Sequence, residues 1–327
     1  MEKLLEIKHL KVSFFTPAGE VRAVNDISYT LDKGEVIGVV GESGSGKSVT
    51  ASAVIGLVEK PGRVIGGSVL FDGRDVTKLS EKEMRSLRGK EIAMIFQDPM
   101  TSLNPLFTIG SQIRESLKLY FGLKGKEADK KAADLLRLVS INEPERRLKQ
   151  YPHEFSGGMR QRVMIAMALA GNPKMLIADE PTTALDVTIQ AQILEIIKDL
   201  KDKISMSVML ITHDLGIVAD IADKVVVMYG GRIVESSPCE DLFRHPSHPY
   251  TVGLLNSIPK LDSSEPLIPI EGTPIDLLNA PGGCPFAQRC DKCMKICLSQ
   301  MPPYTQISEN HQSACWLLDE RAKGGRV

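Results

Sequence analysis

The stretch EVIGVVGESGSGKSVTASAVIGLV, residues 35–58, decides the fold class. It begins with a continuous apolar run over residues 35–40, which predicts a fully buried central strand. A loop rich in glycine and serine follows at once, and the spacing of Ala, Val and Leu after the loop suits a helix. A strand, a glycine loop and a helix in this order form half of a parallel α/β unit.

The loop matches the pattern G-x-x-x-x-G-K-[ST], and it lies between a strand and a helix, which is the context the pattern requires. Its glycines let successive backbone N–H groups surround an anion, and the helix N-terminus adds partial positive charge. We expect Lys47 to reach the β- and γ-phosphates of a nucleotide and the Ser48 hydroxyl to ligate Mg²⁺. The residues expected to bind the nucleotide here are Gly41, Glu42, Ser43, Gly44, Ser45, Gly46, Lys47, Ser48 and Val49.

The second motif is acidic. The sequence MLIADE, residues 175–180, places two consecutive carboxylates at the end of a predicted strand. Asp179 is expected to hold Mg²⁺ through water, and Glu180 to act as the general base that polarises the attacking water. A phosphate loop by itself would allow kinases, GTPases or many ATPases, and the sequence between and after the two motifs decides among them.

The rest of the chain alternates between two patterns. Short β-rich runs over 66–72, 91–96, 174–178, 206–211 and 224–228 predict strands, and helical patterns separate the later ones. Residues 110–148 show charged helical periodicity without a strong strand signal, which indicates an all-helical insertion. Proline and cysteine become dense after about residue 258, so a domain boundary is expected near 258–262.

Composition narrows the function classes. The chain has 40 basic and 41 acidic residues and no long block of one charge, which does not favour a nucleic-acid-binding groove. The N-terminus reads as a strand and not as a secretory signal, so the protein is expected to stay in the cytoplasm. The longest apolar run, VMIAMALAG at residues 163–171, is about half of a bilayer span, so other chains must provide any membrane spans.

A glycine motif directly before the apolar run at 163–171 identifies a family that the chain resembles. FSGGMRQR, residues 155–162, resembles the LSGGQ signature of ATP-binding cassette (ABC) proteins. In that family the motif caps the γ-phosphate bound by a partner subunit, which implies a head-to-tail dimer and a role for Ser156, Gly157 and Gly158 in the partner's site. Met159 stands where glutamine is usual, and we interpret it as a subfamily trait.

Other ABC elements appear in the family's order. Gln97 resembles the Q-loop glutamine that contacts Mg²⁺, and Asp186, in the sequence ALD, resembles the D-loop residue at the dimer interface. His213 resembles the switch histidine that contacts the γ-phosphate. For the adenine the family uses an aromatic residue of an early strand, and we choose Phe14 over Phe15; the alternative is that both rings pack in the sheet.

The resemblance implies the fold. Residues 1–260 are expected to form a P-loop NTPase of the ABC type, an α/β fold with a parallel core sheet, an antiparallel β subdomain and a helical subdomain over about residues 100–172. Residues 261–327 are expected to form a small cysteine-rich C-terminal extension.

Four segments, together with the cysteine-bearing tail, narrow the resemblance to the ATP-binding subunits of dipeptide and oligopeptide permeases: VGESGSGKS, QDPMTSLNP, FSGGMRQR and HPSHPYTVGLL. The resemblance implies peptide import at the cytoplasmic face of the membrane. It also implies two transmembrane permease subunits, a second, related but non-identical ATP-binding subunit, and an extracytoplasmic peptide-binding protein.

Three alternatives remain at this point. Closely similar ATPases serve importers of nickel and other small solutes. A soluble ABC ATPase acting on ribosomes or DNA is disfavoured, since neither a second cassette nor a long coiled coil is present. A regulatory module that no longer hydrolyses ATP is disfavoured by the intact motif residues Lys47, Asp179, Glu180 and His213.

The cysteines raise a separate question. Five of the six lie in the last part of the chain, at positions 284, 290, 293, 297 and 315, and such a cluster of cytosolic thiols suggests metal ligation. The spacing suits zinc or an iron–sulfur cluster, and reduced or disulfide-linked thiols without metal are the remaining alternative. The permease resemblance implies a 4Fe-4S cluster held by Cys284, Cys290, Cys297 and Cys315, with Cys293 as the spare.

Overall fold

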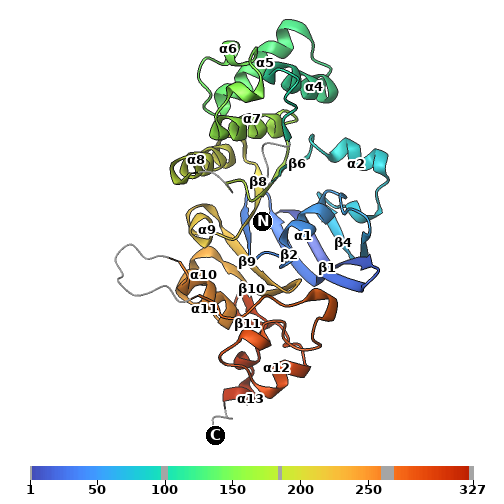
Figure 1. Cartoon of the computed structure of the whole chain (residues 1–327), viewed down its shortest axis with the longest axis vertical. Coiled ribbons are helices and arrows are strands. Elements are labelled where there is room, and N and C mark those ends of the chain that lie inside the picture. The colour runs from blue at the N-terminus through green and yellow to red at the C-terminus, as the bar shows by residue number, and fades with distance from the viewer. Residues whose placement is uncertain (1, 97–101, 183–185, 259–268, 324–327) are drawn as a thin grey trace. The chain divides into compact units, whose positions relative to one another are not determined.

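The structure is a computed structural model that describes residues 2–96, 102–182, 186–258 and 269–323 (Figure 1). The chain forms two compact units: the first contains residues 1–78 and 211–327, and the second contains residues 79–210. Each unit is described by itself.

The first unit contains an antiparallel sheet built from the N-terminal strands. β1 (Lys3–Thr16), β2 (Gly19–Asp32), β4 (Gly62–Phe71) and β5 (Arg74–Asp75) lie in the order β2-β1-β4-β5. A turn at Pro17 and Ala18 joins β1 to β2, with Thr16 paired to Gly19. A short 3-10 helix, η1 (Val76–Lys78), follows β5. This sheet is the antiparallel β subdomain that the family resemblance implied.

A second set of strands in the same unit carries the phosphate-loop motif. The strands β3 (Val36–Val40), β9 (Lys224–Tyr229) and β10 (Arg232–Pro238) lie side by side, with β9 in the middle, parallel to β3 and antiparallel to β10. All five residues of β3 are buried, as the continuous apolar run predicted. The helices of this part are α1 (Lys47–Val54), α9 (Leu215–Ile221), α10 (Cys239–Arg244) and α11 (Pro249–Asn256).

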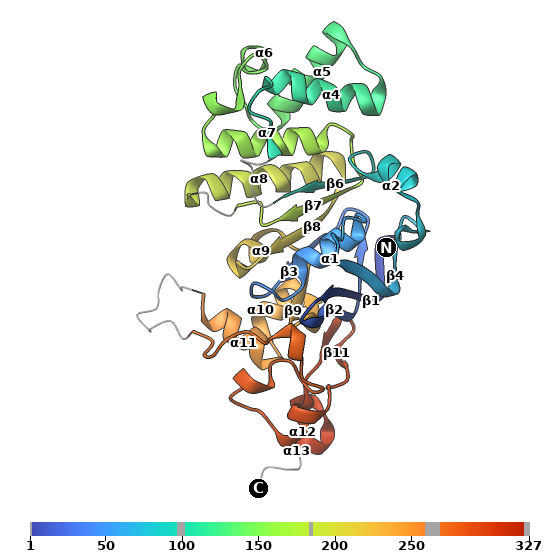
Figure 2. The ribbon, with the colours of Figure 1, turned by 45° about the vertical axis from the view of Figure 1, so that its right-hand side comes forward.

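The C-terminal residues extend this sheet, which the sequence did not predict. β12 (His311–Ser313) pairs with β10, and β11 (Thr305–Ser308), which is labelled in Figure 2, pairs with β12. The remaining short elements are η3 (Leu277–Asn279), η4 (Ala287–Arg289), α12 (Lys295–Ser299), η5 (Trp316–Leu318) and α13 (Glu320–Lys323). The expected boundary between residues 260 and 261 lies outside the described residues.

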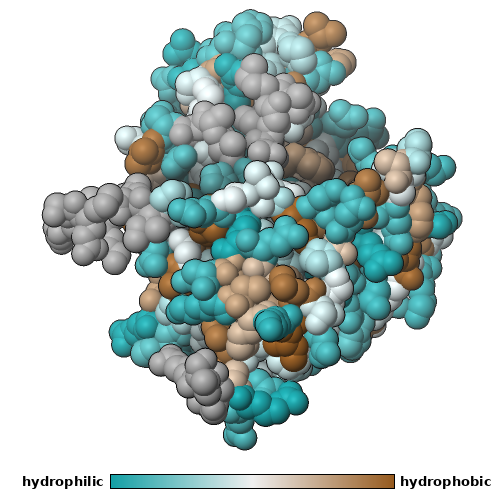
Figure 3. All heavy atoms as spheres, turned by 60° about the horizontal axis from the view of Figure 1, so that its bottom comes forward, coloured by the Kyte–Doolittle hydropathy of each residue, from teal (hydrophilic) through white to brown (hydrophobic). Residues whose placement is uncertain are grey.

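The surface seen in Figure 3 is mostly hydrophilic, with apolar side chains gathered in small groups between polar ones. In the C-terminal region Leu298 of α12 is 57% exposed and Ile307 of β11 is 42% exposed. Within the described part of the chain, no helix is both long and apolar enough to cross a membrane.

The second unit contains the predicted helical insertion. Its helices are α2 (Glu81–Leu87), α4 (Ile109–Phe121), α5 (Gly125–Leu138), α6 (Pro144–Arg147), α7 (Gly157–Leu169) and α8 (Val187–Ile204), with the 3-10 helix η2 (Pro152–Glu154). Helices α4, α5 and α6 lie together on one side of α7 (Figure 1), and residues such as Ile113, Leu117 and Leu136 are fully buried. The strands β6 (Ile92–Ile95) and β7 (Met175–Asp179) pair in parallel. The chain passes from the second unit to the first within β8 (Ser207–Thr212).

Candidate nucleotide-binding site

The loop between β3 and α1 requires glycine at two positions. Gly41 has φ 147°, and a Cβ atom there would lie 2.1 Å from the carbonyl oxygen of Met228. Gly46, which precedes α1, has φ 103°, and its Cβ would lie 2.4 Å from the carbonyl oxygen of Ala23. Since L-residues rarely adopt these angles and no side chain fits, the backbone can take this path only with glycine.

Lys47 is the first residue of α1 and is 5% exposed. Its ammonium group donates to the carbonyl oxygens of Gly41 at 2.6 Å and Glu42 at 2.9 Å, and to the Ser45 hydroxyl at 3.4 Å. The positive charge is therefore held inside the loop, next to the first turn of α1. A helix N-terminus with an adjacent ammonium group is suited to bind an anion.

The outer side of the loop is open to solvent. Ser43, Gly44 and Ser48 are exposed, and Val49 is half-buried on α1. A Cβ atom at Gly44 would meet no atom within 4 Å. The loop residues that the sequence assigned to the nucleotide thus combine a buried ammonium group with an exposed rim that phosphate groups can approach.

Glu42 is fixed by contacts that sequence reasoning did not find. Its backbone N–H donates to the hydroxyl of Tyr250 at 2.8 Å, and its carboxylate pairs with the guanidinium of Arg289, 247 residues away. Tyr250 belongs to the HPSHPY segment, which the sequence analysis used for the permease resemblance. That segment could therefore have pointed to a residue near the phosphate loop. No local pattern marked Arg289.

The two candidate aromatic residues for the adenine lie in β1. Phe14 is half-buried, and its ring lies against the backbone of Gly62, where a Cβ atom would be 2.6 Å from the ring. Phe15 is 40% exposed, with the guanidinium of Arg63 4.2 Å from its ring centroid. The assignment of Phe14 to the adenine stays a prediction.

His213 is exposed and directly follows β8. The next residue, Asp214, caps α9 by accepting a hydrogen bond from the backbone N–H of Gly216 at 2.8 Å. The cap fixes the start of α9 directly after His213.

In the second unit the predicted acidic pair lies at the end of β7. Asp179 is the last residue of the strand and is 7% exposed. Glu180 follows with φ 47°, a left-handed conformation that costs a residue other than glycine about 1–2 kcal/mol. The bend turns the chain away from the strand direction directly after Asp179, so the two carboxylates have different surroundings.

The signature motif begins α7. The Ser156 hydroxyl accepts a hydrogen bond from the Met159 N–H at 3.3 Å, which caps the helix. Ser156 and Gly157 are exposed, whereas Gly158 is buried, and a Cβ atom there would lie 2.6 Å from the Ile189 side chain of α8. Close contact between α7 and α8 therefore depends on Gly158.

Asp186 caps α8 by accepting a hydrogen bond from the Ile189 N–H at 3.0 Å. Two other predicted elements, Gln97 and the first two residues of the ALD motif, lie outside the described residues.

The predicted thiol ligands come together in the first unit. Cys284, Cys290, Cys297 and Cys315 line one small cavity with His248, among other residues, whereas Cys293 is exposed. Burial raises the pKa of Cys284 to about 12 and that of Cys290 to about 11, and burial lowers the pKa of His248 to about 3. In the described residues, no three His, Cys, Asp or Glu side chains form a group that could hold a metal ion.

Cys239, which the sequence set apart from this cluster, is the first residue of α10. Its side chain is 8% exposed, and burial raises the pKa of its thiol.

Family models match two parts of the chain: an ABC transporter model over residues 24–183, and the C-terminal region of oligopeptide/dipeptide transporters over residues 234–297. The chain is 57% identical to the oligopeptide transport ATP-binding protein OppD of Bacillus subtilis over 97% of this chain and 89% of that protein. It is 53% identical to the dipeptide transport ATP-binding protein DppD of the same organism over 99% of this chain and 97% of that protein.

Solved structures agree with the fold. The dimeric post-hydrolysis form of the ATP-binding cassette MJ0796, bound to ADP and Pi, matches with a TM-score of 0.65 and 27% identity over 72% of this chain and 98% of that one. The cassette motifs, the fold and the match to the C-terminal region lead to one conclusion: the chain belongs to the family of ATP-binding subunits of dipeptide and oligopeptide ABC transporters.

Proposed function

We propose that this chain binds and hydrolyses ATP to power the import of dipeptides or oligopeptides. The observation that carries the proposal is the phosphate loop, with Lys47 buried at the start of α1 and glycine required at positions 41 and 46. The relatives named as peptide transport ATP-binding proteins support the cargo.

Each motif residue has a proposed role in ATP hydrolysis. In the first unit, Lys47 and the N-terminus of α1 bind the phosphates, and His213 contacts the γ-phosphate. In the second unit, Glu180 orients and polarises the attacking water as general base. Ser48, Asp179 and Gln97 would hold Mg²⁺, which would offset the charge of the phosphates when bound.

A second ATP-binding subunit is needed for turnover. Ser156 and Gly157 are exposed at the N-terminus of α7, where they are accessible to a nucleotide on another chain. The related MJ0796 cassette is a dimer with bound ADP and Pi, which supports this arrangement. Asp186 lies at the same proposed interface, and we propose a related, non-identical chain as the partner.

The remaining partners are proposed from the family. Two permease subunits would provide the membrane spans, and an extracytoplasmic protein would deliver the peptide. The chain would then lie on the cytoplasmic face of the membrane.

We further propose that residues 261–327 form a cysteine-rich extension with a 4Fe-4S cluster on Cys284, Cys290, Cys297 and Cys315. The support is the small cavity that these four side chains line, although no three of them, as they lie in the described residues, form a group that could hold a metal ion. Thiolates are the usual ligands of iron–sulfur clusters. Because burial raises the pKa of Cys284 and Cys290, these thiols need a positive partner to ionise.

Transport by the reconstituted complex tests the function. The chain, its partner ATPase and the two permeases would be placed in liposomes with ATP inside, and uptake of labelled dipeptides, oligopeptides and Ni²⁺ would be measured with the binding protein outside. We expect peptide uptake that Lys47→Met abolishes and that Lys126→Met, at an exposed position of α5, leaves unchanged. Uptake of Ni²⁺ alone would favour the small-solute importer instead.

A further inference from the structure

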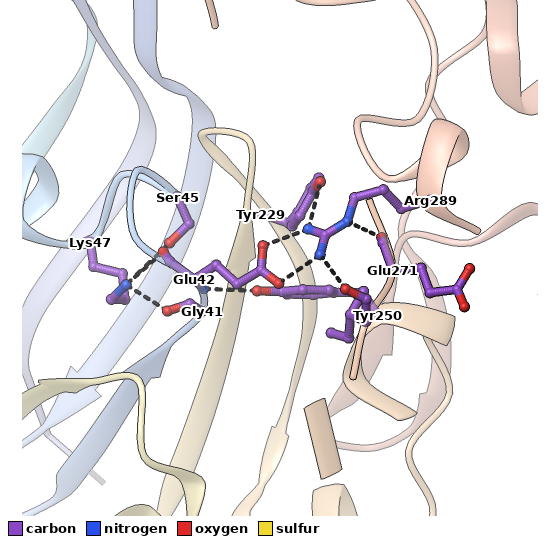
Figure 4. Close-up of polar contacts among 9 residues, drawn as sticks. Gly41, Glu42, Ser45, Lys47, Tyr229, Tyr250, Glu271 and Arg289 are labelled. Carbon is purple, nitrogen blue, oxygen red and sulfur yellow. Dashed lines mark hydrogen bonds and ion pairs between the residues drawn. The ribbon is translucent and has the colours of Figure 1, made fainter. Parts of the chain in front are cut away.

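Every hydrogen-bond donor of the Arg289 side chain has an acceptor. A guanidinium has five N–H donors. Two of them bind the Glu42 carboxylate, from Nη1 at 2.5 Å and from Nη2 at 3.1 Å. The others bind the Tyr229 hydroxyl at 3.2 Å, the Glu271 carbonyl at 2.8 Å and the Ile270 carbonyl at 3.0 Å (Figure 4).

This ion pair is largely shielded from water. The Arg289 side chain is 6% exposed and the Glu42 side chain is 24% exposed. A bidentate arginine–carboxylate pair fixes orientation as well as distance, and removing one partner of a buried pair leaves an uncompensated charge. The Arg289–Glu42 pair therefore differs from ordinary surface ion pairs of this chain.

The pair fixes the phosphate loop from outside. In Figure 4 the Glu42 side chain extends from the loop toward Arg289, whereas Lys47 lies on the other side of the loop. The Glu42 N–H donates to the Tyr250 hydroxyl at 2.8 Å, and the Tyr250 ring contacts Tyr229 edge-on, with the ring centroids 4.6 Å apart. Glu42 is thus held at its backbone and at its carboxylate, between the first and the last glycine-dependent turns of the loop.

Charge gives the pair a second consequence. Glu42 places a carboxylate in a loop that receives the phosphates of a nucleotide, and like charges in a partly buried site repel. Arg289 neutralises this carboxylate and turns it away from Lys47. Without Arg289, the loop would carry an unpaired negative charge and would lose the contact that orients it.

We propose that Arg289 is a positioning residue for nucleotide binding: the C-terminal region, through the Arg289–Glu42 pair, orients the phosphate loop and cancels a carboxylate that would repel ATP. This inference rests on the proposed function and adds to it a role for a residue outside the cassette motifs. Arg289 acts on affinity through Glu42 and takes no part in the chemical step.

Equilibrium titration with a fluorescent ATP analogue, in competition with ATP, tests the proposal on the full chain. Arg289→Met is expected to weaken ATP binding about tenfold, and Arg289→Lys about threefold, since an ammonium restores the charge but not the bidentate contact. The matched control is Arg321→Met, because Arg321 pairs with Asp319 in the same C-terminal region but is 82% exposed. That control should change the affinity less than about twofold.

Two further measurements separate positioning from a general loss of structure. The double variant Glu42→Gln/Arg289→Met removes the unpaired carboxylate and should bind ATP more tightly than Arg289→Met alone. In the reconstituted transporter, Arg289→Met should raise KM for ATP about tenfold and change kcat less than about twofold. Thermal unfolding without nucleotide shows which variants are folded.

The outcomes are distinguishable. A folded Arg289→Met variant with wild-type affinity for ATP would overturn this inference and leave the proposed function standing. If Arg289→Met does not fold, Arg289→Lys and the double variant decide, and wild-type affinity in both would overturn the inference. A wild-type chain that binds no ATP would overturn the proposed function, and this inference with it.

Discussion

Glu235 of β10 and His311 of β12 lie 76 residues apart in the sequence, and their side chains meet at 2.7 Å, from Oε1 to Nε2. Glu235 is 0% exposed and His311 is 2% exposed. The same carboxylate accepts hydrogen bonds from the backbone N–H groups of Ser247 at 2.8 Å and His248 at 2.9 Å. One buried carboxylate therefore joins β10, the start of α11 and the C-terminal strand β12.

Glu235→Gln is expected to destabilise the C-terminal region by about 2–4 kcal/mol, because an amide has one acceptor oxygen and its NH2 group would face a backbone N–H. The single tryptophan of the chain, Trp316, is buried in this region, so its fluorescence reports the transition in urea. The transition should move to lower urea concentration.

The matched control is Glu240→Gln in α10. Glu240 pairs with Arg244, but their side chains are 70% and 69% exposed, so the change should cost less than about 0.5 kcal/mol. Equal shifts for both variants would show that the buried contacts of Glu235 contribute nothing beyond a surface ion pair.

Gly46→Ala is expected to abolish tight ATP binding, since its Cβ atom would lie 2.4 Å from the Ala23 carbonyl oxygen and the residue has φ 103°. Gly44→Ala is the control: φ is 77°, but no atom lies within 4 Å of the added Cβ. The Gly44→Ala variant should lose only about 1–2 kcal/mol of stability, because a residue other than glycine must adopt a left-handed backbone conformation there. ATP titrations of both variants would contradict the argument if Gly44→Ala lost affinity more than Gly46→Ala.

Glu180→Gln is expected to leave ATP binding intact and abolish steady-state hydrolysis, because an amide cannot accept the proton of the attacking water. The measurement is phosphate release by the reconstituted transporter, with ATP affinity measured in parallel. Glu195→Gln, at an exposed position of α8 in the same unit, should hydrolyse ATP at the wild-type rate. Unchanged turnover in Glu180→Gln would remove Glu180 as the general base.

Cys290→Ser and Cys293→Ser form a matched pair for the proposed cluster. Cys290 lines the shared cavity and Cys293 is exposed, so anaerobically reconstituted Cys293→Ser should hold about four irons per chain, like the wild type. Cys290→Ser should lose most of the iron and the absorption near the visible blue. A metal-free wild type, or equal iron in both variants, would refute the ligand assignment.

Several elements could be predicted from the sequence because their signals are local. The apolar run at 35–40 predicted β3, and the charged periodicity at 110–148 predicted the helices α4 and α5. The strands β11 and β12 were not predicted, because they are short and have little apolar periodicity. The position of β12 is set by its pairing with β10.

The sequence by itself determined the family and the phosphate loop, because backbone strain and phosphate chemistry leave few choices at Gly41, Gly46 and Lys47. It also predicted the cysteine ligands, through resemblance to the permease family. Only the tertiary structure decided that Arg289 would pair with Glu42 and that Glu235 would meet His311. These partners are far apart along the chain, and burial sets the strength of their contacts, so no local pattern could reveal them.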